Sequence, residues 1–106
     1  MNLTQLDRLA PKELYPGCRG QFVHAQNVTV AHWSFWPDTP LPLHSHPHEQ
    51  VVNVVRGTFE LTVDGETQRL GPGSVVVVPG GTPHSGKAIT ETYIIDVFYP
   101  VREDYR

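Results

Sequence analysis

The chain has 106 residues, and its 8 basic and 11 acidic side chains give a formal net charge of −3. This length is typical of one domain that buries about two-thirds of its unfolded surface, and the lack of a basic stripe argues against a nucleic-acid partner. No apolar run approaches the length of a membrane span, and the first residues lack the apolar core of a signal peptide. Cys18 is the single cysteine, so no internal disulfide can form, and we expect a cytoplasmic protein.

The first 17 residues predict a peripheral segment. Leu3, Leu6 and Leu9 recur at every third position, which favours one helical turn before Pro11 ends it. We expect these leucines to pack on the rest of the domain or on a partner subunit rather than to carry chemistry.

The remainder of the chain predicts an all-β domain, because ten prolines and nine glycines separate short apolar runs. A proline-rich loop is expected at 37–42, and Asp64-Gly65 is a strong signal for a two-residue hairpin turn. The strands expected around these turns are 20–26, 27–36, 58–63, 66–70, 74–78 and 91–99. Short strands with frequent turns are typical of a sandwich or a barrel.

Two histidines separated by one residue, His44 and His46, precede a valine-rich run that ends at Gly57. Side chains two residues apart on a strand share one face, and Gln50 has the same parity. A third histidine, His84, ends a second organised stretch with the sequence GSVVVVPGGTPH.

These two stretches resemble the motifs of the cupin family, G-x5-H-x-H-x3,4-E-x6-G and G-x5-P-x-G-x2-H-x3-N. The matching residues are His44, His46, Gly57, Gly73, Pro79, Gly81 and His84. The departures are Asp38 for the leading glycine, Gln50 for the usual metal-binding glutamate, and Ala88 for the final asparagine. The resemblance covers 30–106 and implies one domain over 1–106, folded as a cupin double-stranded β-helix (a jelly-roll barrel). It also implies a homodimer, since many small cupins pair.

By this resemblance, one divalent metal ion (Ni, Zn, Mn or Fe) is held by His44, His46 and His84, with the amide oxygen of Gln50 as fourth ligand. An amide cancels none of the charge of the ion. The metal would therefore bind less tightly than with a glutamate, but it would be a stronger Lewis acid and would attract an anionic substrate. The alternative is that Gln50 only forms hydrogen bonds inside a metal-free barrel.

The other three histidines are not expected to bind the metal. His48 has the parity of His44 and His46, but it follows Pro47 at a variable motif position, which favours a place at the rim of the site. His24 and His32 match no motif position, so we expect them to be structural or surface residues.

The last predicted strand, within ETYIIDVFY, is mostly apolar on both faces and contains Asp96. A buried carboxylate needs a partner or has a raised pKa. Asp96 is therefore either a general acid/base that faces the metal or a structural residue paired with an arginine. Apolar walls would raise its pKa, and a nearby cation would oppose that rise.

The ending DVFYPVREDYR and the H-x-H-x3-Q form of the first motif resemble the cupins of pectin and alginate breakdown, which ketonise 4,5-unsaturated uronates. In those proteins three histidines and a glutamine hold the metal, and an aspartate on the last strand is catalytic. A phenylalanine and an arginine that follow it line the site. By position, these residues are Asp96, Phe98 and Arg102. The alternative for Arg102 is a surface arginine paired with Glu103 or Asp104.

This finer resemblance implies an enzyme that acts on a small anionic sugar. Asp96 would move a proton, Arg102 would bind the substrate carboxylate, and Phe98 would pack on the sugar ring. Two alternatives stay open: a small iron or copper dioxygenase, which would consume oxygen without a specific need for Asp96, and a non-catalytic cupin that binds a sugar or another small molecule. Trp33 and Trp36 are expected in the core or a subunit interface rather than as substrate platforms.

Overall fold

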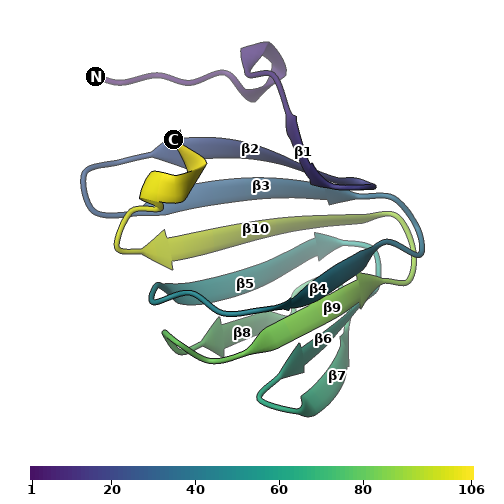
Figure 1. The fold of residues 1–106 in the computed structure, drawn as a ribbon. Coiled ribbons are helices and arrows are strands. Elements are labelled where there is room, and N and C mark those ends of the chain that lie inside the picture. The colour runs from purple at the N-terminus through teal and green to yellow at the C-terminus, as the bar shows by residue number, and fades with distance from the viewer.

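The computed structural model describes residues 1–106 and contains two antiparallel sheets that face each other (Figure 1). The strands are β1 (Lys12–Tyr15), β2 (Cys18–His24), β3 (Thr29–Phe35), β4 (Pro40–His44), β5 (Glu49–Arg56), β6 (Phe59–Val63), β7 (Glu66–Leu70), β8 (Val75–Val78), β9 (His84–Ala88) and β10 (Thr92–Tyr99). Single 3₁₀ turns occur at Leu6–Arg8 and Glu103–Tyr105, and neither helical segment has the length or apolarity to cross a membrane. The prediction of an all-β jelly-roll domain is confirmed.

One sheet has six strands in the order β1-β2-β3-β10-β5-β8, and the other has four in the order β4-β9-β6-β7. Side chains of β3 and β10 alternate between buried and half-buried, because one face of the larger sheet covers the core. Across the core, the rings of Phe35 on β3 and Phe59 on β6 lie 5.1 Å apart. The space between the sheets therefore holds both the apolar core and, at one end, the polar residues described below.

Two segments that were not expected to be strands, one peripheral and one a loop, lie in strands of the structure. Residues 12–15 lie in the segment expected to be peripheral, yet they form β1, which pairs with β2 at the edge of the larger sheet. Pro40 and Pro42 lie in β4, although 37–42 was expected to be a loop. Proline has no N–H to donate to a neighbouring strand, and β4 accommodates both because it is an edge strand that pairs only with β9.

The predicted hairpin is present between β6 and β7, whose register runs from Phe59–Leu70 to Val63–Glu66. Asp64 has φ 48° and Gly65 has φ 81°, the left-handed pair that matches the twist of a two-residue hairpin. The confirmed turn lies next to the start of β9, where Val63 pairs with His84 and the N–H of Asp64 donates to the carbonyl oxygen of Pro83 at 2.9 Å.

Candidate functional site

A pocket between the two sheets brings together most of the residues singled out in the sequence. Its polar lining residues are His44, His46, Gln50, His84, Asp96 and Arg102. His44 is the last residue of β4 and pairs directly with His84, the first residue of β9. These two strands belong to the four-stranded sheet. Gln50 on β5 pairs with Phe98 on β10, and both of these strands belong to the six-stranded sheet. The site therefore lies where side chains from both sheets meet.

His46 does not lie on the same strand as His44, and that expectation is wrong. β4 ends at His44, and His46 lies in the connection that takes the chain from the four-stranded sheet to β5 of the six-stranded sheet. Pro47 follows at once and lacks the N–H that a continuing strand would donate. The side chain still reaches the pocket, and one ring nitrogen from each of His44, His46 and His84 lies within 4.8 Å of the others.

The three histidines share one pattern of hydrogen bonding. In each ring, Nδ1 lies close to a backbone carbonyl oxygen, which can only accept a hydrogen bond. The contacts are His44 to Pro42 (2.7 Å), His46 to His48 (3.1 Å) and His84 to Thr82 (2.8 Å). With the proton on Nδ1, each ring presents the lone pair of Nε2 to the pocket, as metal-ligating histidines do.

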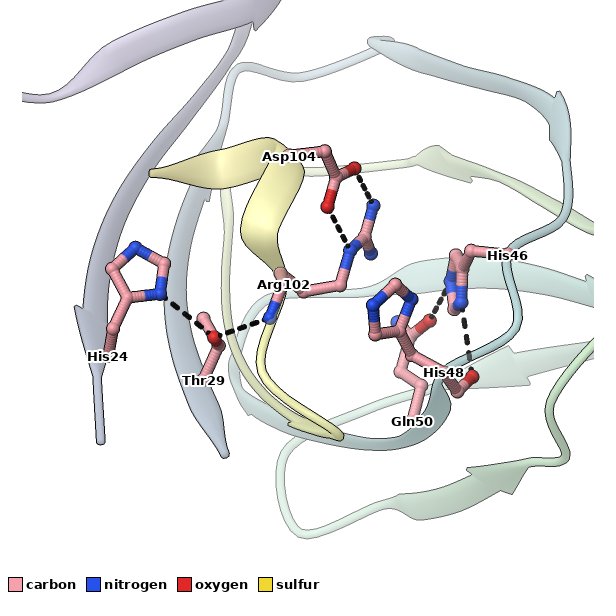
Figure 2. A network of polar contacts seen from close by, with 7 residues as sticks. All are labelled: His24, Thr29, His46, His48, Gln50, Arg102 and Asp104. Carbon is pink, nitrogen blue, oxygen red and sulfur yellow. Dashed lines mark hydrogen bonds and ion pairs between the residues drawn. The ribbon is translucent and has the colours of Figure 1, made fainter. Parts of the chain in front are cut away.

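His46 shows why this arrangement fits a cation. Its Nε2 lies 3.0 Å from Oε1 of Gln50, while its Nδ1 faces the carbonyl oxygen of His48 (Figure 2). A neutral ring has one proton and cannot donate to both oxygens. The ring is neutral at physiological pH, because burial, followed by the charge of Arg102, lowers the pKa of His46 to about 4. A cation bound by Nε2 and Oε1 would remove this conflict between two lone pairs.

His84 and Asp96 supply a second observation of the same kind. Nε2 of His84 and Oδ1 of Asp96 are buried and have no hydrogen-bond partner. Burial also lowers the pKa of His84, which keeps its imidazole neutral and available as a ligand. Unpartnered buried polar atoms are rare, and these two fit a group that binds between them and the other histidines.

Gln50 connects the histidines to Asp96. Its Nε2 donates a hydrogen bond to Oδ2 of Asp96 at 2.9 Å, so its Oε1 is turned toward His46. The amide is thus oriented with nitrogen toward the acid and oxygen toward the three rings. A glutamate at this position would place two carboxylates in contact. The departure from the cupin motif at residue 50 is therefore matched by the acid at residue 96.

Asp96 is buried and forms no ion pair, which argues against a structural pairing with an arginine. Burial raises the pKa of its carboxyl to about 7, and the indole N–H of Trp33, the hydrogen bond from Gln50 and the charge of Arg102 oppose that rise. Near neutral pH the carboxyl is therefore present in both its protonated and its ionised form. A group of this kind can both give and take a proton.

Arg102 is paired with Asp104, as the sequence alternative expected, but it is not a surface residue. Its side chain is 6% exposed and lines the pocket. Nε and Nη2 donate to the two oxygens of Asp104 at 2.9 and 2.7 Å, and the guanidinium lies 4.7 Å from the centre of the Phe98 ring and 4.0 Å from that of Tyr105. Its charge therefore lies at the pocket wall, and its position is set from several sides.

A buried hydroxyl anchors the backbone of Arg102. Its N–H donates to Oγ1 of Thr29 at 2.9 Å, and the same oxygen lies 2.9 Å from Nδ1 of His24 (Figure 2). His24 is thus a structural residue, as expected. Sequence reasoning missed Thr29 and Tyr105 and named Asp104 only as the partner of a surface arginine, because no local motif marks a residue that acts by holding another one in place.

The remaining histidines and Trp36 lie outside the pocket, whereas Trp33 contributes to its lining. The ring of His48 lies 5.5 Å from that of His46, but His48 is not one of the three clustered ligands. His32 contacts the hydroxyl of Tyr93 on the outer face of the larger sheet. Trp33 is buried in the core, whereas Trp36 is 59% exposed at the surface, with Arg19 over its ring.

Comparison with known proteins places this site in a family. KdgF from Halomonas sp. superposes with a TM-score of 0.93 at 28% identity, over 100% of this chain and 99% of that one. An RmlC-like cupin from Shewanella frigidimarina gives a TM-score of 0.94 at 26% identity, over 100% and 96%. Quercetin 2,3-dioxygenase of Bacillus subtilis is 46% identical over 46 residues, which are 43% of this chain and 13% of that enzyme. Residues 31–98 match the cupin domain family, and the chain belongs to that family.

Proposed function

We propose that this protein is a metal-dependent cupin enzyme that ketonises 4,5-unsaturated uronates, with Asp96 as general acid/base. The observation that carries the proposal is the carboxyl of Asp96, buried with one free oxygen in the same pocket as three clustered histidines. The resemblance of the last strand and tail to the uronate-ketonising cupins supports it, as does the full-length structural match to KdgF.

The reaction requires two proton movements. An unsaturated uronate has a double bond between C4 and C5, with the ring oxygen and the carboxylate both on C5. Ring opening leaves an enol at C5, and ketonisation then removes the proton of the enol oxygen and adds a proton to C4. Asp96 in its acid form can protonate C4, and the ionised form that results can accept the proton of the enol. In the metal-free protein the pKa of this carboxyl is about 7, which allows it to give and take a proton near neutral pH.

The residues proposed to hold the metal are His44, His46 and His84 through Nε2 and Gln50 through Oε1. Bound there, a divalent cation would act as a Lewis acid that stabilises negative charge developing on the enol oxygen. Three imidazoles and an amide suit Ni, Zn, Mn or Fe. The amide of Gln50 also donates to Asp96 and so holds the acid beside the ligands.

Arg102 and Phe98 are proposed to bind the substrate. A guanidinium can form two parallel hydrogen bonds with a carboxylate, and Arg102 lies at the pocket beside Asp96. Phe98 is buried on the same face of β10 as Asp96 and can pack against the sugar ring. Together these residues favour a small anionic sugar as the substrate.

The test follows the ultraviolet absorbance of a lyase-generated 4,5-unsaturated uronate with metal-loaded protein. Wild type should remove the absorbance faster than a no-enzyme control, since the ring also opens slowly without a catalyst. Asp96→Asn and His44→Ala should abolish the acceleration, while His32→Ala, a histidine outside the pocket, should retain it. If wild type fails to exceed the background rate with each of the four metals, the uronate proposal is wrong.

A dioxygenase is the second candidate, and one comparison favours it. Over 46 residues the chain is 46% identical to quercetin 2,3-dioxygenase, although it spans only 13% of that enzyme. A dioxygenase would use the histidines but would not need Asp96. Oxygen consumption that survives Asp96→Asn and is lost in His44→Ala would favour this reading, whereas ligand binding that survives His44→Ala would favour a non-catalytic cupin.

We also propose that a second copy of the chain covers the outer face of the six-stranded sheet. One row across five strands of this face consists of valines alone. They are Val23, Val30, Val97, Val51 and Val77, which pair in this order across β2, β3, β10, β5 and β8. Val75 and Val77 on β8 are 60% and 57% exposed. The outer face of an antiparallel sheet is ordinarily polar where it meets water, so a row of this kind indicates an interface.

The area and the charges of this face suit a two-fold dimer. Five strands about 4.8 Å apart and about seven residues long cover roughly 550 Å² of flat sheet, of the order of the ~800 Å² per partner in a standard interface. Arg56 and Glu49 lie at opposite ends of β5. A two-fold axis that runs across the strands would bring each Arg56 near Glu49 of the partner subunit, which complements the charges.

Sedimentation equilibrium tests this interface. Wild type should sediment as a dimer, and Val77→Arg, which places a charge in the valine row, should give monomers. Leu43→Arg is the matched control, because Leu43 is 71% exposed on β4 of the other sheet. A monomeric wild type at micromolar concentration, or an equal effect of Leu43→Arg, would contradict the proposed interface.

A further inference from the structure

Contacts from the turn at 103–105 and from two neighbouring strands fix the side chain and backbone of Arg102 and leave one edge of its guanidinium free. Nε and Nη2 donate to Asp104, and the plane of the group lies against the rings of Phe98 and Tyr105. The backbone N–H is bound to the buried hydroxyl of Thr29. An arginine side chain ordinarily samples many rotamers, and these contacts leave it little freedom.

The geometry of the pair with Asp104 leaves a second pair of donors free. A guanidinium has five N–H bonds, and Asp104 uses the edge formed by Nε and Nη2. The edge formed by Nη1 and the other hydrogen of Nη2 has the same spacing and points in a different direction. Both side-chain hydrogen bonds of good geometry go to Asp104 and leave Nη1 unused, although the hydroxyl of Tyr105 also interacts with the guanidinium. Since Arg102 lines the pocket, the free edge can meet a planar oxyanion there.

Asp104 itself lies outside the chemistry. Its side chain is 56% exposed, and it is absent from the pocket lining. Its carboxylate forms its ion pair with Arg102, while Glu103 of the same turn pairs with Arg106. Its direct contact with the pocket lining is therefore through Arg102.

We propose that Asp104 is a positioning residue that aims the free edge of Arg102 at a carboxylate of the ligand. Asp104 holds one edge of the guanidinium in a fixed geometry, so the second edge is oriented before the ligand arrives. Orientation before binding lowers the entropy lost on binding, which strengthens recognition of the carboxylate without a new contact. The identity of that carboxylate as a uronate rests on the proposed function, while the positioning role does not.

The test compares Asp104→Asn with Asp104→Glu and with Glu103→Gln, a matched change in the neighbouring ion pair of the same turn. Calorimetry with metal-loaded protein would measure the affinity for galacturonate, a saturated uronate that cannot be ketonised, and for galactose, which lacks the carboxylate. In Asp104→Asn we expect galacturonate affinity to fall roughly 10-fold, which is the lower end of the effect of changing residues that orient metal ligands. Galactose affinity, metal affinity and thermal stability should stay unchanged.

Two further readouts separate positioning from a general structural effect. In Asp104→Asn the Nε–H signal of Arg102 in NMR spectra should lose its protection from exchange, and Asp104→Glu should restore part of both the protection and the affinity. Where turnover is measurable, Asp104→Asn should raise KM for the unsaturated uronate more than it lowers kcat. Glu103→Gln should behave as wild type throughout.

The outcomes distinguish this inference from the proposed function. A wild type that binds galacturonate and loses affinity in Asp104→Asn, yet does not ketonise unsaturated uronates, would support the positioning role and refute the uronate reaction. An Asp104→Asn variant that binds galacturonate as tightly as wild type would overturn the inference. So would an equal loss of galactose affinity, or a wild type that binds no carboxylate in the pocket.

Discussion

Exchanging the acid and the amide of the Gln50–Asp96 pair tests the reasoning about this site most directly. In the wild type, Nε2 of Gln50 donates to Oδ2 of Asp96 at 2.9 Å. Gln50→Glu removes the donor and places two buried carboxyl groups in contact. Gln50→Glu with Asp96→Asn restores a donor and an acceptor, with the direction of the hydrogen bond reversed. The single change should therefore be costly and the double change should recover stability.

The size of the effect follows from the charges. Two unit charges about 4 Å apart interact by about 4 kcal/mol at an effective dielectric constant of about 20, equivalent to about three pH units. The pair in Gln50→Glu should therefore keep one proton well above pH 7. The folded state then binds a proton that the unfolded chain has released, so stability falls as pH rises. In the wild type the carboxyl of Asp96 has a pKa of about 7, so it is ionised in the folded protein above that pH and causes no further loss of stability.

Chemical denaturation of the metal-free proteins between pH 5 and 9 measures this difference. We expect Gln50→Glu to match wild type near pH 5 and to fall below it above pH 7, by up to about 4 kcal/mol. The double variant should recover most of the loss at high pH while lacking the general acid/base. A Gln50→Glu variant with the pH dependence of wild type, or a double variant no more stable than the single one at pH 9, would show that the two side chains are not coupled in this way.

Three other predictions follow from the site and the turns. First, a saturating divalent metal should raise the Tm of wild type by roughly 10 °C in differential scanning calorimetry, as expected for a ligand at about 100 times its Kd. His84→Ala should not show this rise in Tm. An unchanged rise would exclude His84 as a ligand. Second, the folded-state pKa of Asp96 is raised to about 7, so metal-free wild type should lose up to roughly 4 kcal/mol of stability between pH 4 and pH 7. Asp96→Asn should not show this loss. Parallel pH profiles of the two proteins in denaturant melts would contradict the burial of that charge. Third, Gly57→Ala should destabilise the protein by about 1–3 kcal/mol more than Gly73→Ala does. Both glycines have φ 89°, but a Cβ added at residue 57 would lie 2.1 Å from the carbonyl oxygen of Glu91, whereas a Cβ added at residue 73 would meet no atom within 4 Å. Equal losses of stability in urea melts would contradict the steric contribution.

Much of the fold could be predicted because its signals are local. Asp64-Gly65 favours a left-handed turn in any context, and the alternation in 29–35 is a property of neighbouring residues. The expectation failed at Pro40 and Pro42, because whether a proline can lie in a strand depends on whether that strand is at a sheet edge. An edge is defined by sheet order, which no short stretch of sequence contains.

The candidate metal ligands were predictable for a related reason, since His44, His46 and His84 stand in spaced motifs. Even so, the assumed mechanism for the first pair was wrong: the two side chains converge across a change of sheet rather than along one strand. The motif spacing identifies residues that meet in the folded protein, but it does not give the path of the backbone between them.

The sequence by itself determined the family, the β-rich domain and the set of residues that could hold a metal, because spacing and turn chemistry act over a few residues. Only the tertiary structure decided how those residues are used. It turned the amide of Gln50 toward Asp96, which is 46 positions away, and it bound the backbone of Arg102 to Thr29, which is 73 positions away. It also buried Asp96 and so raised its pKa to about 7. These properties arise from strand register and burial, which bring distant residues into contact and exclude water from them.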